Sequence, residues 1–216
     1  MNPFETEAAR YDQWFESPKG RLIFEQEVKC LRQLIGGTEG RWMEIGVGTG
    51  RFAEALDIRE GIDPSEAVLK YASDRGVQTS RGFGEDLPYS DLSFDGLLMV
   101  VTICFLDDPH KAFKECRRVL KNKGCLIVGL VPADSRWGKF YMRKGKEGNT
   151  FYSIARFYTC EQVLEIAADT GFTYKDAGSC LYAPPDKPAT DFTFRKGIDE
   201  KAGFVAMKFL KNENPL

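Results

Sequence analysis

Two runs of almost uninterrupted apolar residues, 94–101 (FDGLLMVV) and 125–131 (CLIVGLV), most restrict how this chain can fold. Strands with such runs are buried on both faces, which is typical of a parallel sheet covered by helices on either side. Segments with helical spacing alternate with the strand-like segments, at 19–35, 50–56, 65–75 and 108–121. Because strands and helices alternate in this way, the sequence predicts a doubly wound, mostly parallel α/β sheet.

The C-terminal part continues the pattern less regularly. A helix is predicted at 159–170, and strands are predicted at 172–182 and 203–210. The stretch 183–200 carries three prolines and is predicted to be a loop. Residues 132–158 are aromatic and basic but have no clear periodicity, so no element is predicted there.

Size and charge exclude several classes of protein. The 216 residues and 43% hydrophobic content predict one domain, 1–216, with a full core. A formal net charge of −2 offers no global field for nucleic acid or an anionic membrane. No apolar run is long enough to cross a bilayer, and the N-terminus does not resemble a signal peptide. We therefore expect neither nucleic acid nor a membrane as partner.

The cysteine and histidine content points to a reducing compartment without a metal site. None of the six cysteines forms a C-x-x-C pair, and His110 is the only histidine. This pattern predicts reduced thiols in a cytoplasmic protein and no metal. His110 follows Asp108-Pro109 at a predicted helix start, and we expect it on the surface rather than in a catalytic site.

The sequence Glu44-Ile45-Gly46-Val47-Gly48-Thr49-Gly50 joins a predicted strand to a predicted helix. Glycines allow the backbone to turn sharply and to approach a ligand closely, at the carboxyl end of the first strand. A dinucleotide site requires G-x-G-x-x-G, and here Arg51 stands in place of the third glycine. The loop therefore predicts a nucleotide-like cofactor and disfavours an NAD-dependent oxidoreductase.

Asp63 is the predicted partner of this loop. It ends the next predicted strand, 13 residues beyond Gly50. A carboxylate at that place can accept hydrogen bonds from both ribose hydroxyls of an adenosine. The alternative is that Asp63 only caps the helix that follows.

At this point the chain resembles the class I S-adenosylmethionine-dependent methyltransferases. The ordered motifs are E-I-G-V-G-T-G, G-I-D-P-S, G-x-G-E-D-L-P, S-F-D and R-V-L-K, within about 40–131. The most similar branch acts on small molecules and includes ubiquinone- and menaquinone-biosynthesis-like enzymes; R-F-Y-T and G-F near 156–172 are also typical of it. The resemblance implies a Rossmann-like, doubly wound, mostly parallel seven-stranded sheet with helices on both faces and a C-terminal antiparallel strand.

The resemblance also implies the cofactor, S-adenosylmethionine, and the product S-adenosylhomocysteine. Gly46 and Gly48 would pack against the methionine and ribose parts, and Glu44 would position the loop or the amino group. Asp63 would bind the ribose, with Pro64 or Ser65 near the adenine.

Two further sites follow from the same resemblance. Gly84 and Glu85 would meet the adenine edge, although Phe83 stands where a polar residue is common. Met99 and Val100 end the fourth strand, where backbone carbonyls would meet the methionine ammonium. The core 40–131 is thus expected to bind the cofactor.

The acceptor side is expected to use the segments around this core: 1–36 with a possible lid, 132–158 as a variable lid, and 159–216 completing the sheet. Candidate acceptor contacts are Tyr11, Trp14, Cys104, Tyr141, Arg156 and Tyr158. Tyr11 and Trp14 have simple helix packing as the alternative, and Cys104 has the alternative of a buried packing thiol. For the aromatic and basic stretch 136–146, a plain surface or nucleic-acid binding remain as alternatives to a lid.

Methyl transfer from a sulfonium is an in-line displacement that depends mainly on positioning, and the sequence offers no obvious general base. The predicted function is therefore methyl transfer from S-adenosylmethionine to a small molecule of unknown identity. The alternative is a protein that binds this cofactor without methylating, as a sensor or regulatory subunit. The acceptor atom and the oligomeric state are not predicted.

Overall fold

The structure is a computed structural model that describes residues 2–36, 38–187 and 192–212. Its sheet has the strand order β3-β2-β1-β4-β5-β8-β6-β7. The strands are β1 Trp42–Ile45, β2 Glu60–Asp63, β3 Gln78–Arg81, β4 Phe94–Val100, β5 Leu120–Leu130, β6 Phe172–Cys180, β7 Arg195–Lys196 and β8 Phe204–Lys211. The first five strands pair in parallel, and β8 runs antiparallel between β5 and β6.

The mostly parallel sheet with an antiparallel C-terminal strand is confirmed, but the number of strands is eight instead of seven. The additional strand β7 lies inside 183–200, which the prolines had predicted to be a loop. It pairs with β6 through only Gly178–Lys196 and Ser179–Arg195. A two-residue edge strand has no period that a sequence pattern can reveal, because both of its residues are exposed.

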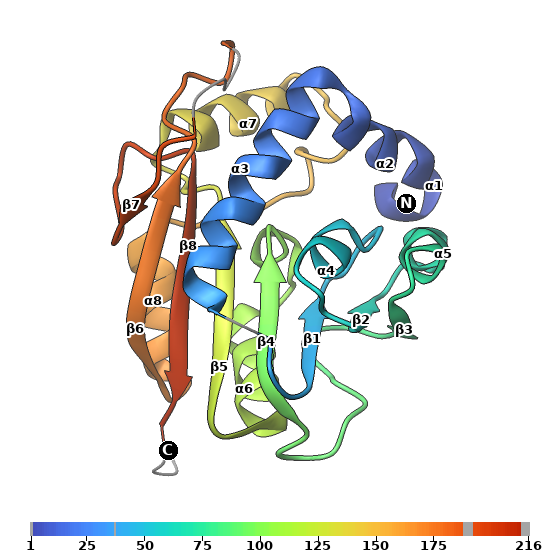
Figure 1. The fold of residues 1–216 in the computed structure, drawn as a ribbon. Coiled ribbons are helices and arrows are strands. Elements are labelled where there is room, and N and C mark those ends of the chain that lie inside the picture. Colours follow the sequence, from blue (N-terminus) through green and yellow to red (C-terminus); the bar gives the residue numbers. More distant parts are fainter. Residues whose placement is uncertain (1, 37, 188–191, 213–216) are drawn as a thin grey trace.

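Helices cover both faces of the sheet (Figure 1). They are α1 Pro3–Thr6, α2 Ala8–Glu16, α3 Pro18–Ile35, α4 Arg51–Ala55, α5 Glu66–Asp74, α6 Pro109–Val119, α7 Arg136–Lys146 and α8 Cys160–Asp169, with a 3₁₀ turn η1 at Ile103–Phe105. Helices α3 and α4 lie in front of the sheet in Figure 1, and α6 and α8 lie behind it.

The apolar strand β4 separates two hydrophobic cores. Leu98 and Val100 point to the core shared with α3, α4 and α5. Leu97 and Met99 point to the core shared with α6 and α8. Because successive residues of a strand face opposite sides, a strand between two helical layers has to be apolar throughout.

Helix α7 falls within 132–158, where the sequence had predicted no element. Its start is capped by Ser135, whose Oγ accepts a hydrogen bond from the Gly138 N–H at 2.9 Å. A Cβ on Gly138 would lie 2.1 Å from the Pro132 carbonyl oxygen, so the helix packs too closely against the preceding loop for a side chain. Trp137 and Tyr141 lie one turn apart on this helix and both pack against the first core, so the segment does carry a helical spacing that the sequence analysis did not identify.

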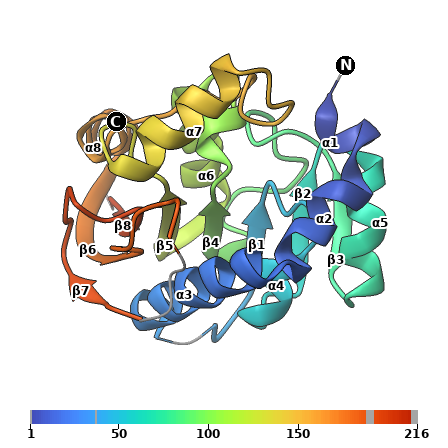
Figure 2. The same ribbon diagram turned by 90° about the horizontal axis from the view of Figure 1, so that it is seen from above.

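The carboxyl ends of β1 and β4 define the place of the site. Strand β1 pairs with β2 on one side and with β4 on the other, so the strand order reverses between β1 and β4. In open α/β sheets ligands bind at such a switch point. Figure 2 shows α1, α2 and α3 on one side of this region and α7 on the other.

Candidate active site

The glycine loop turns directly after β1 and presses against neighbouring backbone. Gly46 and Gly48 have φ values of +68° and +52°, in the left-handed region that favours glycine. The Gly46 and Val47 N–H groups both donate to the Ile62 carbonyl oxygen, at 2.8 and 3.0 Å. A Cβ on Gly46 would lie 2.2 Å from Thr102 Cγ2. The loop is therefore held between β2 and the segment after β4.

Gly46→Ala should be severely destabilising because it adds steric overlap to backbone strain. We expect its free energy of unfolding to fall by more than about 2 kcal/mol, since left-handed backbone alone costs roughly 1–2 kcal/mol. Gly36→Ala is the matched control, because Gly36 has a φ of +71° but no atom within 4 Å of its added Cβ. Denaturant unfolding of both variants measures the difference, and equal losses would contradict the tight packing of the loop.

Asp63 at the end of β2 is fixed by two backbone groups. Its Oδ2 accepts from the Gly48 N–H and its Oδ1 from the Ser65 N–H, both at 3.0 Å. Burial of the carboxyl raises its pKa, and these two hydrogen bonds oppose that shift. Each oxygen keeps a lone pair for a further donor, so the carboxylate is suited to bind two neighbouring hydroxyl groups.

A cavity of about 650 Å³, which we call the Asp63 cavity, lies beside this carboxylate. Predicted residues that line it are Gly46, Gly48, Asp63, Pro64, Gly84, Glu85 and Val100. The exposed Phe83 also lines it. The Glu85 carboxylate accepts from the Asp107 N–H at 2.8 Å, which ties this side of the cavity to the start of α6. Ser65 lies outside the lining: its hydroxyl donates to Glu5 of α1 at 2.7 Å.

A second cavity of about 540 Å³, which we call the aromatic cavity, adjoins the first. Residues that line both are Phe4, Tyr11, Gly46, Val100, Val101 and Phe105. The two cavities therefore meet at the glycine loop and at the end of β4. Val101 has a φ of +51°, which is rare for a β-branched residue and marks local strain at this junction.

Glu44 on β1 is the buried acid of the aromatic cavity. Its side chain is 1% exposed, and its Oε2 has no hydrogen-bond partner among the described residues. Burial raises the pKa of this carboxyl well above its usual range, and the negative charge of Asp63 adds to the shift. A buried oxygen without a partner costs free energy, so it is suited to a ligand that brings a donor or a positive charge.

Aromatic side chains from three segments close over both cavities. Phe4 of α1 makes edge contacts with Tyr11 of α2 and Phe105 of η1, at centroid distances of 5.3 and 4.9 Å. Phe151, from the segment after α7, lies 5.3 Å from Phe4 and 5.6 Å from Tyr11. The N-terminal helices and the segment after α7 therefore form one covering layer.

Only some of the candidate acceptor residues line a cavity in the structure. Tyr11, Trp14, Cys104 and Tyr141 line the aromatic cavity, whereas Arg156 and Tyr158 line neither cavity. Arg156 is exposed and Tyr158 packs against the α6–α8 side of the sheet.

Met99 and Cys104 have structural roles that the sequence left open. Met99 also lies outside both cavities, because its side chain is fully buried in the second core. The Cys104 thiol donates to the Val101 carbonyl oxygen at 3.3 Å, and burial raises the pKa of the thiol to about 12. Cys104 is therefore a protonated thiol at neutral pH.

Glu27 on α3 is a site residue that the sequence analysis missed. It is 6% exposed and lines the aromatic cavity. Burial raises the pKa of its carboxyl to about 8. The signal available in the sequence was an acid on the otherwise apolar face of α3, among Ile23, Val28 and Leu31. Phe4, Phe151 and Tyr152 were also missed, because only the folded chain brings them to this edge of the sheet.

The raised pKa of Glu27 predicts a pH-dependent stability. Between its usual value of 4.5 and its folded value of about 8, the folded state binds more protons than the unfolded state, so rising pH lowers stability. Relative to the wild type, Glu27→Gln should gain up to about 1.4 kcal/mol per pH unit within this window. Thermal unfolding at pH 5 and pH 8 tests this, with the exposed Glu25→Gln on the same helix as control. A constant difference between Glu27→Gln and wild type would contradict it.

His110 and possible metal ligands complete the survey of reactive groups. His110 lies on the surface, as expected, with Nε2 3.6 Å from an Asp169 carboxylate oxygen. Among the described residues no group of three or more His, Cys, Asp and Glu side chains is placed to hold a metal ion. In the same part of the chain no helix has the length and apolarity to cross a bilayer.

The fold and the paired cavities define a class of protein. An arrangement with a glycine loop after β1, an acid ending β2 and a buried carboxyl beside the loop is chemically suited to a nucleoside that carries a charged amino-acid end. The comparisons with known proteins agree. Residues 43–128 match the family described as methyltransferase domain.

Individual proteins are similar to this chain over most or part of its length. The chain is similar to a crystal structure of an S-adenosylmethionine-dependent methyltransferase from Thermotoga maritima, described as a possible histamine N-methyltransferase. The two share 38% identity with a TM-score of 0.90 over 97% of this chain and 98% of that one. An uncharacterized protein of Mycobacterium tuberculosis is 39% identical over 97% of this chain and 76% of its own length. A demethylmenaquinone methyltransferase of Thermotoga maritima is 28% identical over 60% of this chain and 69% of its own.

This chain belongs to the class I S-adenosylmethionine-dependent methyltransferases, in the branch that acts on small molecules. It is thus an enzyme that transfers a methyl group from S-adenosylmethionine, as the sequence predicted. Nothing in the fold or the comparisons favours the alternative of a cofactor-binding protein without activity.

Proposed function

We propose that residues 40–131 hold S-adenosylmethionine across the two cavities and that the aromatic cavity receives a small-molecule acceptor. The observation that carries this proposal is the junction of the two cavities at Gly46 and Val101. A cofactor that spans this junction would place its adenosine beside Asp63 and its methionine end beside Glu44. The cofactor supplies an electrophilic methyl group on a sulfonium.

Different residues of this chain would bind different parts of the cofactor. Asp63 would accept the ribose hydroxyls, and the Gly46–Gly48 backbone would lie against the ribose and methionine parts. Pro64, Gly84 and Glu85 border the same cavity on the side proposed for the adenine. The Val100 carbonyl oxygen accepts from Thr102 Oγ1 at 3.1 Å and keeps one lone pair, whereas the buried Glu44 Oε2 has no partner among the described residues. Glu44 is the stronger candidate for the ammonium group.

The acceptor would enter a dry, aromatic environment. Tyr11, Trp14, Tyr141 and Cys104 border the aromatic cavity, and the covering layer formed by Phe4 and Phe151 would exclude water. Exclusion of water favours a reaction in which charge on sulfur is lost, because competing hydration is removed. The Thermotoga maritima crystal structure is described as a possible histamine N-methyltransferase, so histamine is one compound to include in an acceptor screen.

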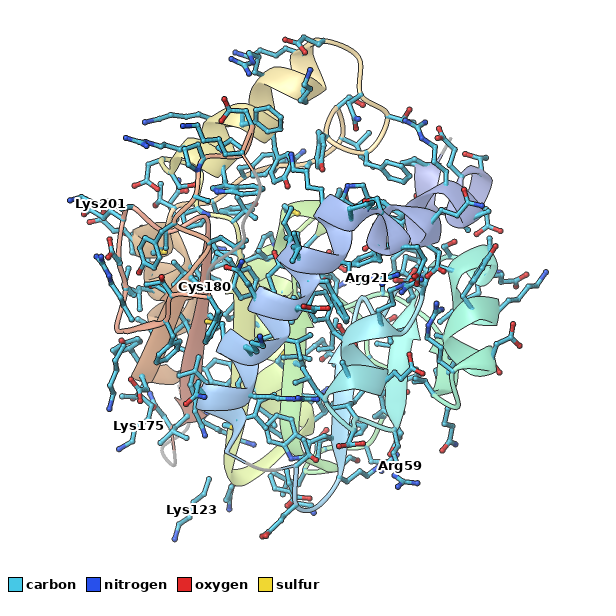
Figure 3. All side chains as sticks on the ribbon, turned by 45° about the horizontal axis from the view of Figure 1, so that its top comes forward. Arg21, Arg59, Lys123, Lys175, Cys180 and Lys201 are labelled. Carbon is cyan, nitrogen blue, oxygen red and sulfur yellow. The ribbon has the colours of Figure 1, made fainter. Side chains whose placement is uncertain are left out.

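A large nucleic acid is a poorer partner for this surface. The formal net charge is −2, which provides no global attraction for a phosphate backbone. In Figure 3 the labelled Arg59, Lys123, Lys175 and Lys201 lie at separate places along the outline of the molecule, and the basic residues of 136–146 belong to the single helix α7. The free cysteines of the described chain also support the proposal of a cytoplasmic location.

Isothermal titration with S-adenosylhomocysteine tests the cofactor site, and a screen with isotopically labelled S-adenosylmethionine tests methyl transfer. We expect binding with a stoichiometry of one per chain and label transfer to a small molecule. Binding without transfer to any compound of a broad acceptor panel would favour a sensor instead. Absence of binding would contradict the proposed site.

A further inference from the structure

The carboxyl of Glu27 has no neutralising partner in the cavity it faces. It is held on the buried face of α3, and its side chain makes no hydrogen bond or ion pair within the described residues. A buried carboxyl without a partner is costly, and the surrounding chain does nothing to offset the cost. Such a group is expected where a ligand supplies the missing partner.

The cations that line the aromatic cavity already have interaction partners within the protein. Arg51 is paired with Asp12 and Glu16, and Lys144 with Glu147. Arg10 is paired with Glu7, and Lys19 donates to the Pro185 carbonyl oxygen at 2.5 Å. Three of these four cations are ion-paired, and Lys19 contacts a neutral carbonyl and the rings of Trp137 and Phe140. The buried carboxyls Glu27 and Glu44 have no ion pair among the described residues and outnumber this one cation, so the cavity favours a positively charged ligand.

Aromatic rings surround Glu27 and connect it to the cofactor side. Tyr141 and Tyr152 stack with a centroid distance of 4.4 Å, and both experience the charge of Glu27. Tyr11 experiences the charges of Asp63, Glu44 and Glu27 together, so all three carboxyls lie near this one ring. Ring faces attract cations as well as apolar groups, which adds to the preference set by the carboxyls.

We propose that Glu27 binds the amino group of an acceptor that carries an amine on an aromatic or apolar body, and that it removes a proton from that nitrogen for methylation. This inference rests on the proposed function of the site. It assigns the acceptor class, an amine, and a catalytic base that the glycine-loop motifs do not include.

The proposed step is balanced in atoms and charge. The ammonium form of the acceptor transfers one proton to a Glu27 oxygen, which frees the nitrogen lone pair. The nitrogen forms its bond to the methyl carbon while the carbon–sulfur bond breaks and sulfur keeps the electron pair. The products are the methylated ammonium and S-adenosylhomocysteine, and the proton on Glu27 later leaves to water.

In the ligand-free protein burial raises the pKa of the Glu27 carboxyl to about 8. A bound ammonium group lowers this pKa, so Glu27 can hold the ammonium as a carboxylate and then accept its proton. Titratable and charged groups that face Glu27 or line the same cavity are Arg10 and Tyr11 of α2, Tyr141 and Lys144 of α7, Tyr152, Cys180 of β6, Glu44 of β1, Lys19 of α3, Arg51 of α4 and Cys104. Burial raises the pKa values of these tyrosines and of Cys104, and a hydrogen bond with Cys30 together with burial raises that of Cys180, so they stay neutral near pH 7.

Binding is tested on the full chain saturated with S-adenosylhomocysteine. The probes are matched pairs: 2-phenylethylamine with 2-phenylethanol, tyramine with tyrosol, and tryptamine with tryptophol. We expect at least one amine to bind the wild type about tenfold or more tightly than its alcohol. Glu27→Gln should remove this preference, while Glu25→Gln, exposed on the same helix, should keep it.

Methyl transfer to the bound amine supplies the second measurement. We expect kcat for Glu27→Gln to fall by about 10²- to 10⁴-fold, with partial recovery in Glu27→Asp. In the wild type kcat/KM should rise with pH through the ionisation of Glu27, and Glu27→Gln should lose that step.

The outcomes separate this inference from the proposed function. Binding of S-adenosylhomocysteine with no amine preference in any pair would overturn the role of Glu27 and leave the cofactor site intact. An amine preference that survives in Glu27→Gln would overturn it as well. Failure of S-adenosylhomocysteine to bind would contradict both proposals.

Discussion

Asp63→Ala should lower the affinity for S-adenosylhomocysteine by roughly 10- to 150-fold, or about 1.5–3 kcal/mol. The carboxylate would no longer accept the two ribose hydroxyls, and hydrogen bonds to a charged acceptor are the stronger kind. The loss also frees the Gly48 and Ser65 N–H groups, which now donate to Asp63. Isothermal titration at pH 7.5 measures the change.

The control for this prediction is Asp74→Ala, at the exposed end of α5. It removes the same functional group on the neighbouring helix and should leave the affinity unchanged. Circular dichroism should show that Asp63→Ala stays folded, because its side chain lies at a strand end. An unchanged affinity in folded Asp63→Ala would place the ribose elsewhere.

Binding of S-adenosylhomocysteine should release protons from Glu44 at pH values above the usual pKa of a carboxyl. In the free protein burial raises the pKa of this carboxyl well above its usual value of 4.5, so it is protonated over a range above that value. A bound ammonium group would favour the carboxylate and lower the pKa in the complex. Because the complex then binds fewer protons than the free protein, affinity should rise with pH, by up to about tenfold per unit.

Titration in phosphate and in Tris measures this release, since the binding enthalpy differs between buffers only when protons are exchanged. Glu44→Gln should bind more weakly, by about 10-fold or more, and should lose the buffer dependence. The exposed Glu54→Gln on α4 serves as control. Equal enthalpies for the wild type in both buffers would show that Glu44 does not pair with the ammonium group.

The sequence predicted most accurately the features of the fold that depend on local patterns. The apolar runs of β4 and β5 and the helices between them predicted the parallel sheet, because a strand buried on both faces has no polar positions. The motifs around Gly46, Gly48 and Asp63 resembled those of S-adenosylmethionine-dependent methyltransferases, and the comparisons confirm that family and its cofactor. Strand β7 was missed because it has only two residues, whereas α7 was missed although its apolar residues recur at helical spacing.

The acceptor side of the site depended on contacts between distant parts of the chain. Glu27 lies on a helix whose pattern predicts an amphipathic segment. The acid on its buried face is the one local signal, and it does not show that the side chain faces a cavity. Its environment includes Tyr11, Tyr141 and Tyr152, from the N-terminal helix, α7 and the segment after α7.

The sequence by itself thus determined the parallel sheet and the glycine turn after its first strand, because these follow from short-range periodicity and turn chemistry. Only the tertiary structure decided which carboxyls are buried without a partner. That property depends on the desolvation of Glu44 and Glu27 by elements far apart in the chain, and on the pairing of nearby cations with other acids. Burial of this kind is a property of the packed molecule, and no local pattern encodes it.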